Sequence, residues 1–109
     1  MSILEDITPL DEERIYSKLK HITFCRTLIF FHENFKKEGF AYLSDLAKLL
    51  KTSYSTAYTS AKLLENLNLV KFIKKASNFV EIVPVMEGNP PTPKINKYIQ
   101  FAKKTLGVD

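Results

Sequence analysis

The chain has few of the residues that build several common kinds of site. Its 109 residues include one cysteine, three glycines and no tryptophan. A single cysteine, Cys25, excludes an internal disulfide framework, and His21 and His32 have no companions at the spacing of a zinc site. Three scattered glycines form no glycine-rich phosphate loop. We therefore expect no metal site and no cofactor, and we expect Cys25 to be a small buried hydrophobe.

Long apolar runs and catalytic arrangements are missing as well. The longest apolar runs, such as Leu28–Phe31, fall far short of the roughly 20 residues that cross a bilayer. The acidic first residues lack the basic and apolar regions of a signal peptide, so we expect a cytoplasmic location without membrane contact. The spacing suggests no Ser-His-Asp, Cys-His or paired-carboxylate set. Enzyme is therefore the least favoured class, and no catalytic residue is predicted.

The charge of the chain is unevenly distributed. Residues 1–13 carry five acids and no base, whereas the remainder holds all 16 bases against seven acids, a surplus of nine. A body this basic favours a polyanionic partner, and nucleic acid is the commonest one. A lysine-rich surface that serves solubility alone is the alternative, and charge by itself leaves both open.

Two helices are predicted before residue 40. Thr8 can cap a helix that begins at Pro9. A second helix is predicted over 22–37, with Gly39 at its end. One apolar face of this helix is formed by Phe24, Leu28, Phe31 and Phe35, and Cys25, Ile29 and Phe30 widen it. Because a helix this apolar must be covered on several sides, we expect a second copy of the chain to pack against it.

Residues 40–84 are predicted to form two short helices and a hairpin. The first helix covers Leu43–Leu50, with Leu46, Leu49 and Leu50 facing inward. After the break Lys51–Ser53, Ser53 caps a helix over 54–67, and Asn68 ends it. The inner face of this helix is formed by Ala57, Ala61, Leu64 and Leu67. Val70–Lys74 and Phe79–Pro84 are predicted strands on either side of a turn at Lys75–Asn78.

The C-terminal part is predicted to be a linker and a helix. The prolines of residues 85–93 forbid regular structure there. Residues 94–106 form an amphipathic helix whose solvated face carries Lys94, Lys97, Lys103 and Lys104. The whole chain, 1–109, is then one domain, divided into N-terminal helices (9–37), a core (40–84), the linker (85–93) and the last helix (94–106).

The order of two short helices and a hairpin is typical of helix-turn-helix proteins, whose second helix enters the major groove. Leu46-Ala47, Ser53, Thr56-Ala57 and the run Leu64–Val70 give these 45 residues a fairly specific pattern. In this pattern residues 40–84 resemble the winged helix-turn-helix of MarR-like and ArsR-like transcription regulators. The resemblance implies a recognition helix at 54–67, a hairpin wing at 70–84 and flanking helices that dimerise. The expected fold is therefore mainly α with a small β-hairpin wing, an α+β fold.

The expected interface with duplex DNA covers the outer face of the recognition helix, the turn before it and the wing. Its predicted residues are Lys51, Ser53, Tyr54, Ser55, Tyr58, Thr59, Lys62, Lys71, Lys74, Lys75, Ser77 and Asn78. Hydroxyls can bond phosphate oxygens or base edges, and lysines favour phosphate. Capping alone also explains Ser53, and a solvated edge strand also explains Lys71. The recognition helix has no arginine, so we expect moderate or weak sequence selectivity.

A homodimer is expected through the flanking helices. The predicted contacts are Ile15, Leu19, Ile22, Cys25, Ile29, Ile95, Ile99, Ala102 and Leu106. The function that follows is a dimeric transcription regulator, located on the nucleoid when bound to DNA, with no effector identified. Two alternatives stay open: an architectural or partition-type protein that coats DNA, and a winged-helix module that binds another protein.

Overall fold

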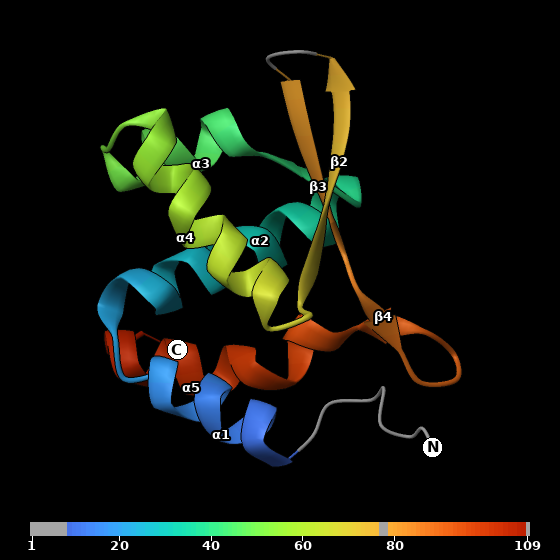
Figure 1. The fold of residues 1–109 in the computed structure, drawn as a ribbon. Helices are drawn as coiled ribbons and strands as arrows, with labels where there is room; N and C mark the ends of the chain where they lie inside the picture. The colour runs from blue at the N-terminus through green and yellow to red at the C-terminus, as the bar shows by residue number, and fades with distance from the viewer. Residues whose placement is uncertain (1–8, 77–78, 109) are drawn as a thin grey trace.

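The computed structural model describes residues 9–76 and 79–108, so Thr8 and the turn residues Ser77 and Asn78 lie outside the described residues. Within these ranges the fold is mixed α/β, with five α-helices and a small antiparallel sheet (Figure 1). The α-helices are α1 (Pro9–Lys18), α2 (Ile22–Glu38), α3 (Leu43–Leu50), α4 (Tyr54–Asn66) and α5 (Ile99–Leu106). No helix in these ranges has the length and apolarity needed to cross a membrane.

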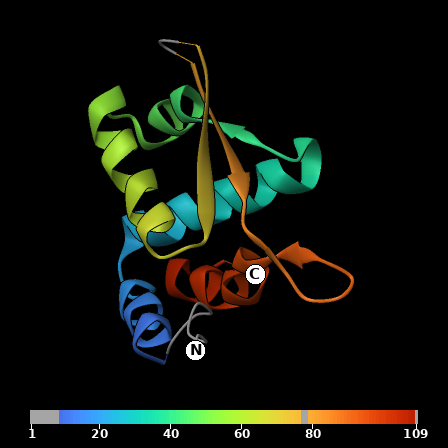
Figure 2. The ribbon, with the colours of Figure 1, turned by 45° about the vertical axis from the view of Figure 1, so that its right-hand side comes forward.

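Helix α2 lies at the centre of the molecule (Figure 2). It ends at Gly39, whose φ of +85° is the left-handed conformation predicted for this position. Its buried residues, Phe24, Cys25, Thr27, Leu28, Phe31 and Phe35, face α3, α4, α5 and the first strand. Elements of the same chain cover these buried side chains, so this face of α2 needs no second copy, and the homodimer stays a prediction.

Helix α3 has the predicted boundaries, and α4 begins at the predicted Tyr54 and ends at Asn66, one residue before the predicted Leu67. Ser53 caps α4 by accepting a hydrogen bond from the Thr56 amide at 3.1 Å. Asn68, at φ +63°, follows the helix in the left-handed conformation. The inner face of α4 is confirmed, because Ala57, Ala61 and Leu64 are fully buried. The prediction that Leu49 faces inward is wrong, because its side chain is 43% exposed.

The three-stranded sheet pairs β1 (Ala41–Tyr42), β3 (Phe79–Pro84) and β2 (Val70–Ala76), in that order. Both pairings are antiparallel, with Phe72 opposite Ile82. The strand β2 runs two residues past the predicted Lys74, so Lys75 and Ala76 belong to the strand and not to a turn. In this sheet β2 is an edge strand, and the hairpin of β2 and β3 projects from the helical body (Figure 1).

The segment after the hairpin is more ordered than predicted. Two short strands, β4 (Met86–Glu87) and β5 (Thr92–Pro93), pair across the predicted linker. The last helical segment begins as a 3-10 helix, η2 (Lys94–Tyr98), before α5 starts at Ile99. The prediction that Lys94 belongs to a solvated face is wrong, because this residue is only 6% exposed. The prolines of this segment prevent long strands, but two residues on each side can still pair.

Candidate nucleic-acid interface

The outer face of α4 carries polar and aromatic side chains at helical spacing. Because Ala57, Ala61 and Leu64 are turned into the core, residues on the opposite side of the helix point to solvent. Tyr54 is 42% exposed and Tyr58 is 40% exposed. Ser55 and Thr59 are exposed beside them. The structure thus places together the side chains that the sequence predicted for this helix.

Two hydroxyls at the start of α4 already donate hydrogen bonds within the protein. Ser53 Oγ donates to Thr56 Oγ1 at 3.0 Å in addition to its capping bond. Thr59 Oγ1 donates to the Ser55 carbonyl at 3.2 Å. The hydrogen atoms of Ser53 and Thr59 are therefore engaged within the helix, and their oxygens can act mainly as further acceptors. Capping fully explains Ser53.

Lys62 is held against the hairpin. Its Nζ forms an ion pair with Glu65 and lies 4.9 Å from the centre of the Phe72 ring. The bond to Glu65 raises the pKa of Lys62. Phe72 also meets Tyr58 edge to face, with ring centroids 5.5 Å apart. Lys62 is therefore a cation already engaged by the fold but still 43% exposed, and its contact with phosphate stays a prediction.

The hairpin and the turn before α4 extend the same surface with cations. Lys71 and Lys74 are exposed on β2, the strand whose Phe72 contacts Tyr58 and Lys62 of α4. Lys51 is exposed after α3, with φ +54°. The other predicted wing residues, Ser77 and Asn78, lie outside the described residues, as does the side chain of Lys75.

Two residues of this region were missed by sequence reasoning. Arg26 of α2 donates from its guanidinium to the Leu49 carbonyl at 3.1 Å, near the break between α3 and α4. Glu65 accepts a bond from the Phe72 amide at 3.0 Å with the carboxylate oxygen that Lys62 does not use. Arg26 lies 23 residues before its partner, so no local pattern could reveal it. Glu65 lies within the run Leu64–Val70 that resembles the family pattern. Its partner Phe72 lies beyond that run, so the pattern did not indicate the contact.

Most of the predicted dimer contacts lie inside a single chain. Ile15, Cys25, Ile95 and Ala102 have no exposed area, and Leu19 and Ile99 are at most 5% exposed. These six side chains form the core between α1, α2 and α5, so their assignment to an interface between copies is corrected. Ile29 and Leu106 are partly buried against that core. Ile22 alone of the nine is largely exposed, at 62%.

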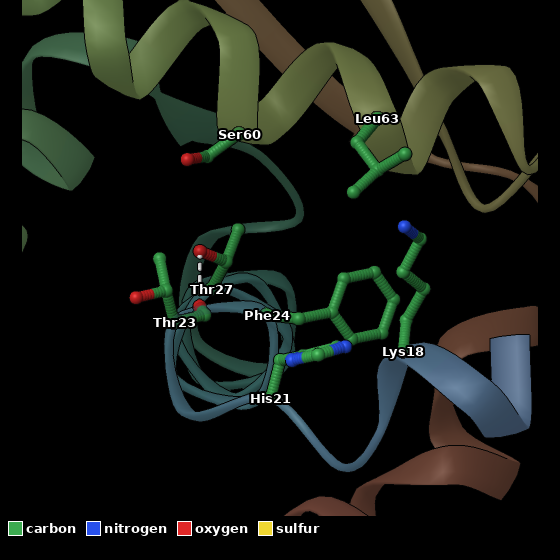
Figure 3. A pocket seen from close by; sticks show the side chains of 7 residues that line it. All are labelled: Lys18, His21, Thr23, Phe24, Thr27, Ser60 and Leu63. Carbon is green, nitrogen blue, oxygen red and sulfur yellow. Dashed lines mark hydrogen bonds between the residues drawn. The ribbon is translucent and has the colours of Figure 1, made fainter.

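Two hollows lie beside α4. An open groove of about 400 Å³ follows its outer face and is lined by Tyr58, Thr59, Ser60, Lys62, Leu63 and Asn66. A cavity of about 330 Å³ lies between α4 and the start of α2 (Figure 3). Lys18 and His21 give this cavity a polar side, and Phe24 and Leu63 give it an apolar wall.

The remaining candidates for chemistry have structural partners. His32 Nδ1 lies 3.1 Å from Asn96 Oδ1. Cys25 is fully buried, as predicted, and its thiol donates to the Leu19 carbonyl at 3.1 Å. Burial raises the pKa of this thiol against a smaller lowering by Thr105, which disfavours the reactive thiolate. Among the described residues no group of His, Cys, Asp or Glu could hold a metal ion.

No protein-family model, no curated protein and no solved structure matches the chain. What the chain does must therefore be inferred from its own residues and geometry.

Proposed function

We propose that this chain binds duplex DNA as a winged helix-turn-helix protein. In this proposal α4 is the recognition helix, α3 is the supporting helix and the β2–β3 hairpin is the wing. The observation that carries the proposal is the exposed outer face of α4, with Tyr54 and Tyr58, and the packing of Tyr58 on Phe72 of β2. The same strand carries the exposed lysines Lys71 and Lys74.

The dimensions of α4 suit the major groove. Its 13 residues span about 20 Å at 1.5 Å per residue, and the groove, about 12 Å wide, admits an α-helix. With Tyr58 and Thr59 toward the bases, Lys71 and Lys74 would lie beside the sugar-phosphate backbone. Contacts of this kind position the protein and make its affinity depend on salt.

The composition of the surface favours modest sequence selectivity. Hydroxyls bond several base edges, and α4 offers no arginine for a bidentate contact with guanine. A transcription regulator is the first form of the proposal, and an architectural protein that coats DNA is the second. A footprint that grows with protein concentration without a preferred site would favour the second form.

We also propose a homodimer, since two-fold symmetry would place two recognition helices about one helical turn apart on the duplex. A second copy would have to bind through side chains that remain exposed. Tyr16, Ile22 and Phe101 are such side chains, between 44% and 62% exposed. Light scattering on the purified chain at several concentrations tests this part of the proposal.

The decisive experiment is fluorescence anisotropy of a labelled random duplex of about 30 base pairs, titrated at several salt concentrations. We expect binding at micromolar or lower concentration that weakens steeply with salt. The variant with Tyr58, Lys62 and Lys74 replaced by alanine should lose affinity. The matched control replaces Lys36, Lys37 and Met86, which are exposed on α2 and β4, by alanine and should bind like the wild type.

Two results would contradict the proposal. If the wild-type chain fails to bind even at low salt, a module that binds another protein through the same surface becomes the better interpretation. If the two triple variants lose affinity equally, the chain binds DNA through some other surface.

A further inference from the structure

An acidic residue lies at the junction of α4 and β2, the two elements of the surface that we propose for DNA. Glu65 stands in the last turn of α4, and its carboxylate is part-buried, 25% exposed, between α4 and β2. A carboxylate at this place repels a phosphate backbone. Its presence on a DNA-binding surface therefore needs a physical reason.

The contacts of Glu65 supply that reason. One carboxylate oxygen pairs with Lys62 of its own helix, and the other accepts the Phe72 amide of β2 at 3.0 Å. Lys71 lies near enough to act on the same carboxylate by its charge. Both oxygens are thus occupied, and one of them joins the recognition helix directly to the hairpin.

The Phe72 amide is a donor that the sheet leaves free. Because β2 is an edge strand, half of its backbone groups point away from β3. Glu65 covers one of these groups, and the same Phe72 ring contacts Tyr58 and the ammonium of Lys62. We refer to these four residues, Tyr58, Lys62, Glu65 and Phe72, as the helix–hairpin clasp.

We propose that Glu65 is a positioning residue, which fixes the hairpin against α4 so that both elements meet the duplex as one preformed surface. This inference rests on the proposed function. Without the carboxylate, the hairpin would be free to change its angle to α4. DNA binding would then have to order it, and ordering side chains and loops on binding costs affinity.

Substitution of Glu65 separates this role from simple electrostatics by the sign of the effect. If the carboxylate only repels DNA, its removal tightens binding about twofold. If it positions the hairpin, E65A weakens binding about fivefold or more in spite of the lost negative charge.

The matched control is D45N. Asp45 is an exposed acid in the first turn of the neighbouring α3, so its neutralisation should leave DNA binding unchanged or slightly tighter. E65Q gives a graded variant, since its amide oxygen can still accept from the Phe72 amide while the ion pair with Lys62 is lost. We expect E65Q to bind more weakly than the wild type and more tightly than E65A.

The test is anisotropy on the random duplex for wild type, E65Q, E65A and D45N, together with amide hydrogen exchange of the free proteins. We expect faster exchange of the Phe72 amide in E65A, while the amides of α2 keep their protection. If E65A fails to fold, E65Q carries the affinity comparison, because weaker binding than the wild type despite the lost negative charge still separates positioning from repulsion.

Three outcomes would overturn the inference. Tighter binding by both Glu65 variants, as in D45N, would assign the carboxylate a repulsive role only. Unchanged exchange at Phe72 in E65A would remove its positioning role, whatever happens to DNA binding. Absence of binding by the wild type would instead overturn the proposed function, and this inference with it.

Discussion

The ring of Tyr58 in α4 meets the ring of Phe72 in β2 edge to face, with centroids 5.5 Å apart and planes at 90°. This contact leaves Tyr58 40% exposed, so one side of the ring packs on the hairpin and the rest remains accessible. The same residue can therefore support the fold with its ring and a ligand with its hydroxyl.

Substitution of Tyr58 by phenylalanine separates these two roles. The Y58F variant keeps the ring contact, so its free energy of unfolding should stay within about 0.5 kcal/mol of the wild type. Loss of a hydroxyl contact should raise the Kd for duplex DNA about two- to tenfold. Urea unfolding and anisotropy measure the two quantities. Y16F, on the exposed face of α1, is the control, and equal DNA affinity of Y58F and Y16F would exclude a contact by the Tyr58 hydroxyl.

Ser53 allows capping to be distinguished from DNA contact. Loss of the cap in S53A should lower the free energy of unfolding by about 1 kcal/mol. S53D retains a capping acceptor and adds a favourable charge at the helix N-terminus, so its stability should equal that of the wild type. The new negative charge lies where α4 would enter the groove, and DNA affinity should fall. A stable S53D that binds DNA as tightly as the wild type would argue against this orientation of α4.

The exposed lysines of β2 should be visible in the salt dependence of DNA binding. If Lys71 and Lys74 each neutralise one phosphate, replacing both by alanine lowers the slope of log Kobs against log salt by about two. Replacing Lys36 and Lys37, in the last turn of α2, should leave the slope unchanged. The slopes come from titrations at four or more salt concentrations. A slope that stays constant in the hairpin variant would mean that these lysines are only solvated.

Truncation to alanine should destabilise the protein strongly at Ile15 and hardly at Ile22, although the sequence assigned both residues to a dimer interface. Ile15 has no exposed area and Ile22 is 62% exposed. I15A should lower the free energy of unfolding by about 2–5 kcal/mol, whereas I22A should change it by less than about 0.5 kcal/mol. Denaturation at two protein concentrations tenfold apart is the measurement. A loss in I15A that grows on dilution would return this side chain to an interface between copies.

Tyr98 should make stability fall at high pH. Burial raises the pKa of its phenol to about 12, and the negative charges of Glu12, Tyr16 and Glu87 act in the same direction. The unfolded chain ionises this group near its ordinary value of about 10. Below pH 10 the phenol is protonated in both states, so the stabilisation of the folded protein by this group is fully present. As the pH rises from 10 toward 12, the unfolded chain loses this proton first, and the free energy of unfolding falls. Urea unfolding across this range should show a steeper loss for the wild type than for Y98F.

The same variant tests the unpaired state of the Tyr98 hydroxyl at neutral pH. The side chain is fully buried, and its hydroxyl has no hydrogen-bond partner among the residues that the structure describes. Removing an unsatisfied buried hydroxyl should leave the free energy of unfolding unchanged or raise it by about 1 kcal/mol. A loss of more than 1 kcal/mol in Y98F would mean that the hydroxyl is bonded in solution.

Features that depend on neighbouring residues could be predicted from the amino-acid sequence. The bounds of α3, the cap at Ser53 and the left-handed residues Gly39 and Asn68 were predicted correctly. So were the inner face of α4 and the two strands of the hairpin. Caps, turns and the periodicity of a helix are set within about four residues, and such patterns can be identified in the chain directly.

Which surfaces meet could not be predicted in this way. The apolar α2 suggested a second copy, but α5, some 60 residues later, covers it within the same chain. Leu49 is exposed and Lys94 is buried, each the opposite of what its local pattern predicted. Glu65 is hydrogen-bonded to Phe72 of β2, and the periodicity of α4 contains no sign of that contact. Burial and hydrogen bonding across elements depend on how distant segments pack together. A hydrophobic or charged position in the sequence states only that some partner is needed, and the fold determines which one it contacts.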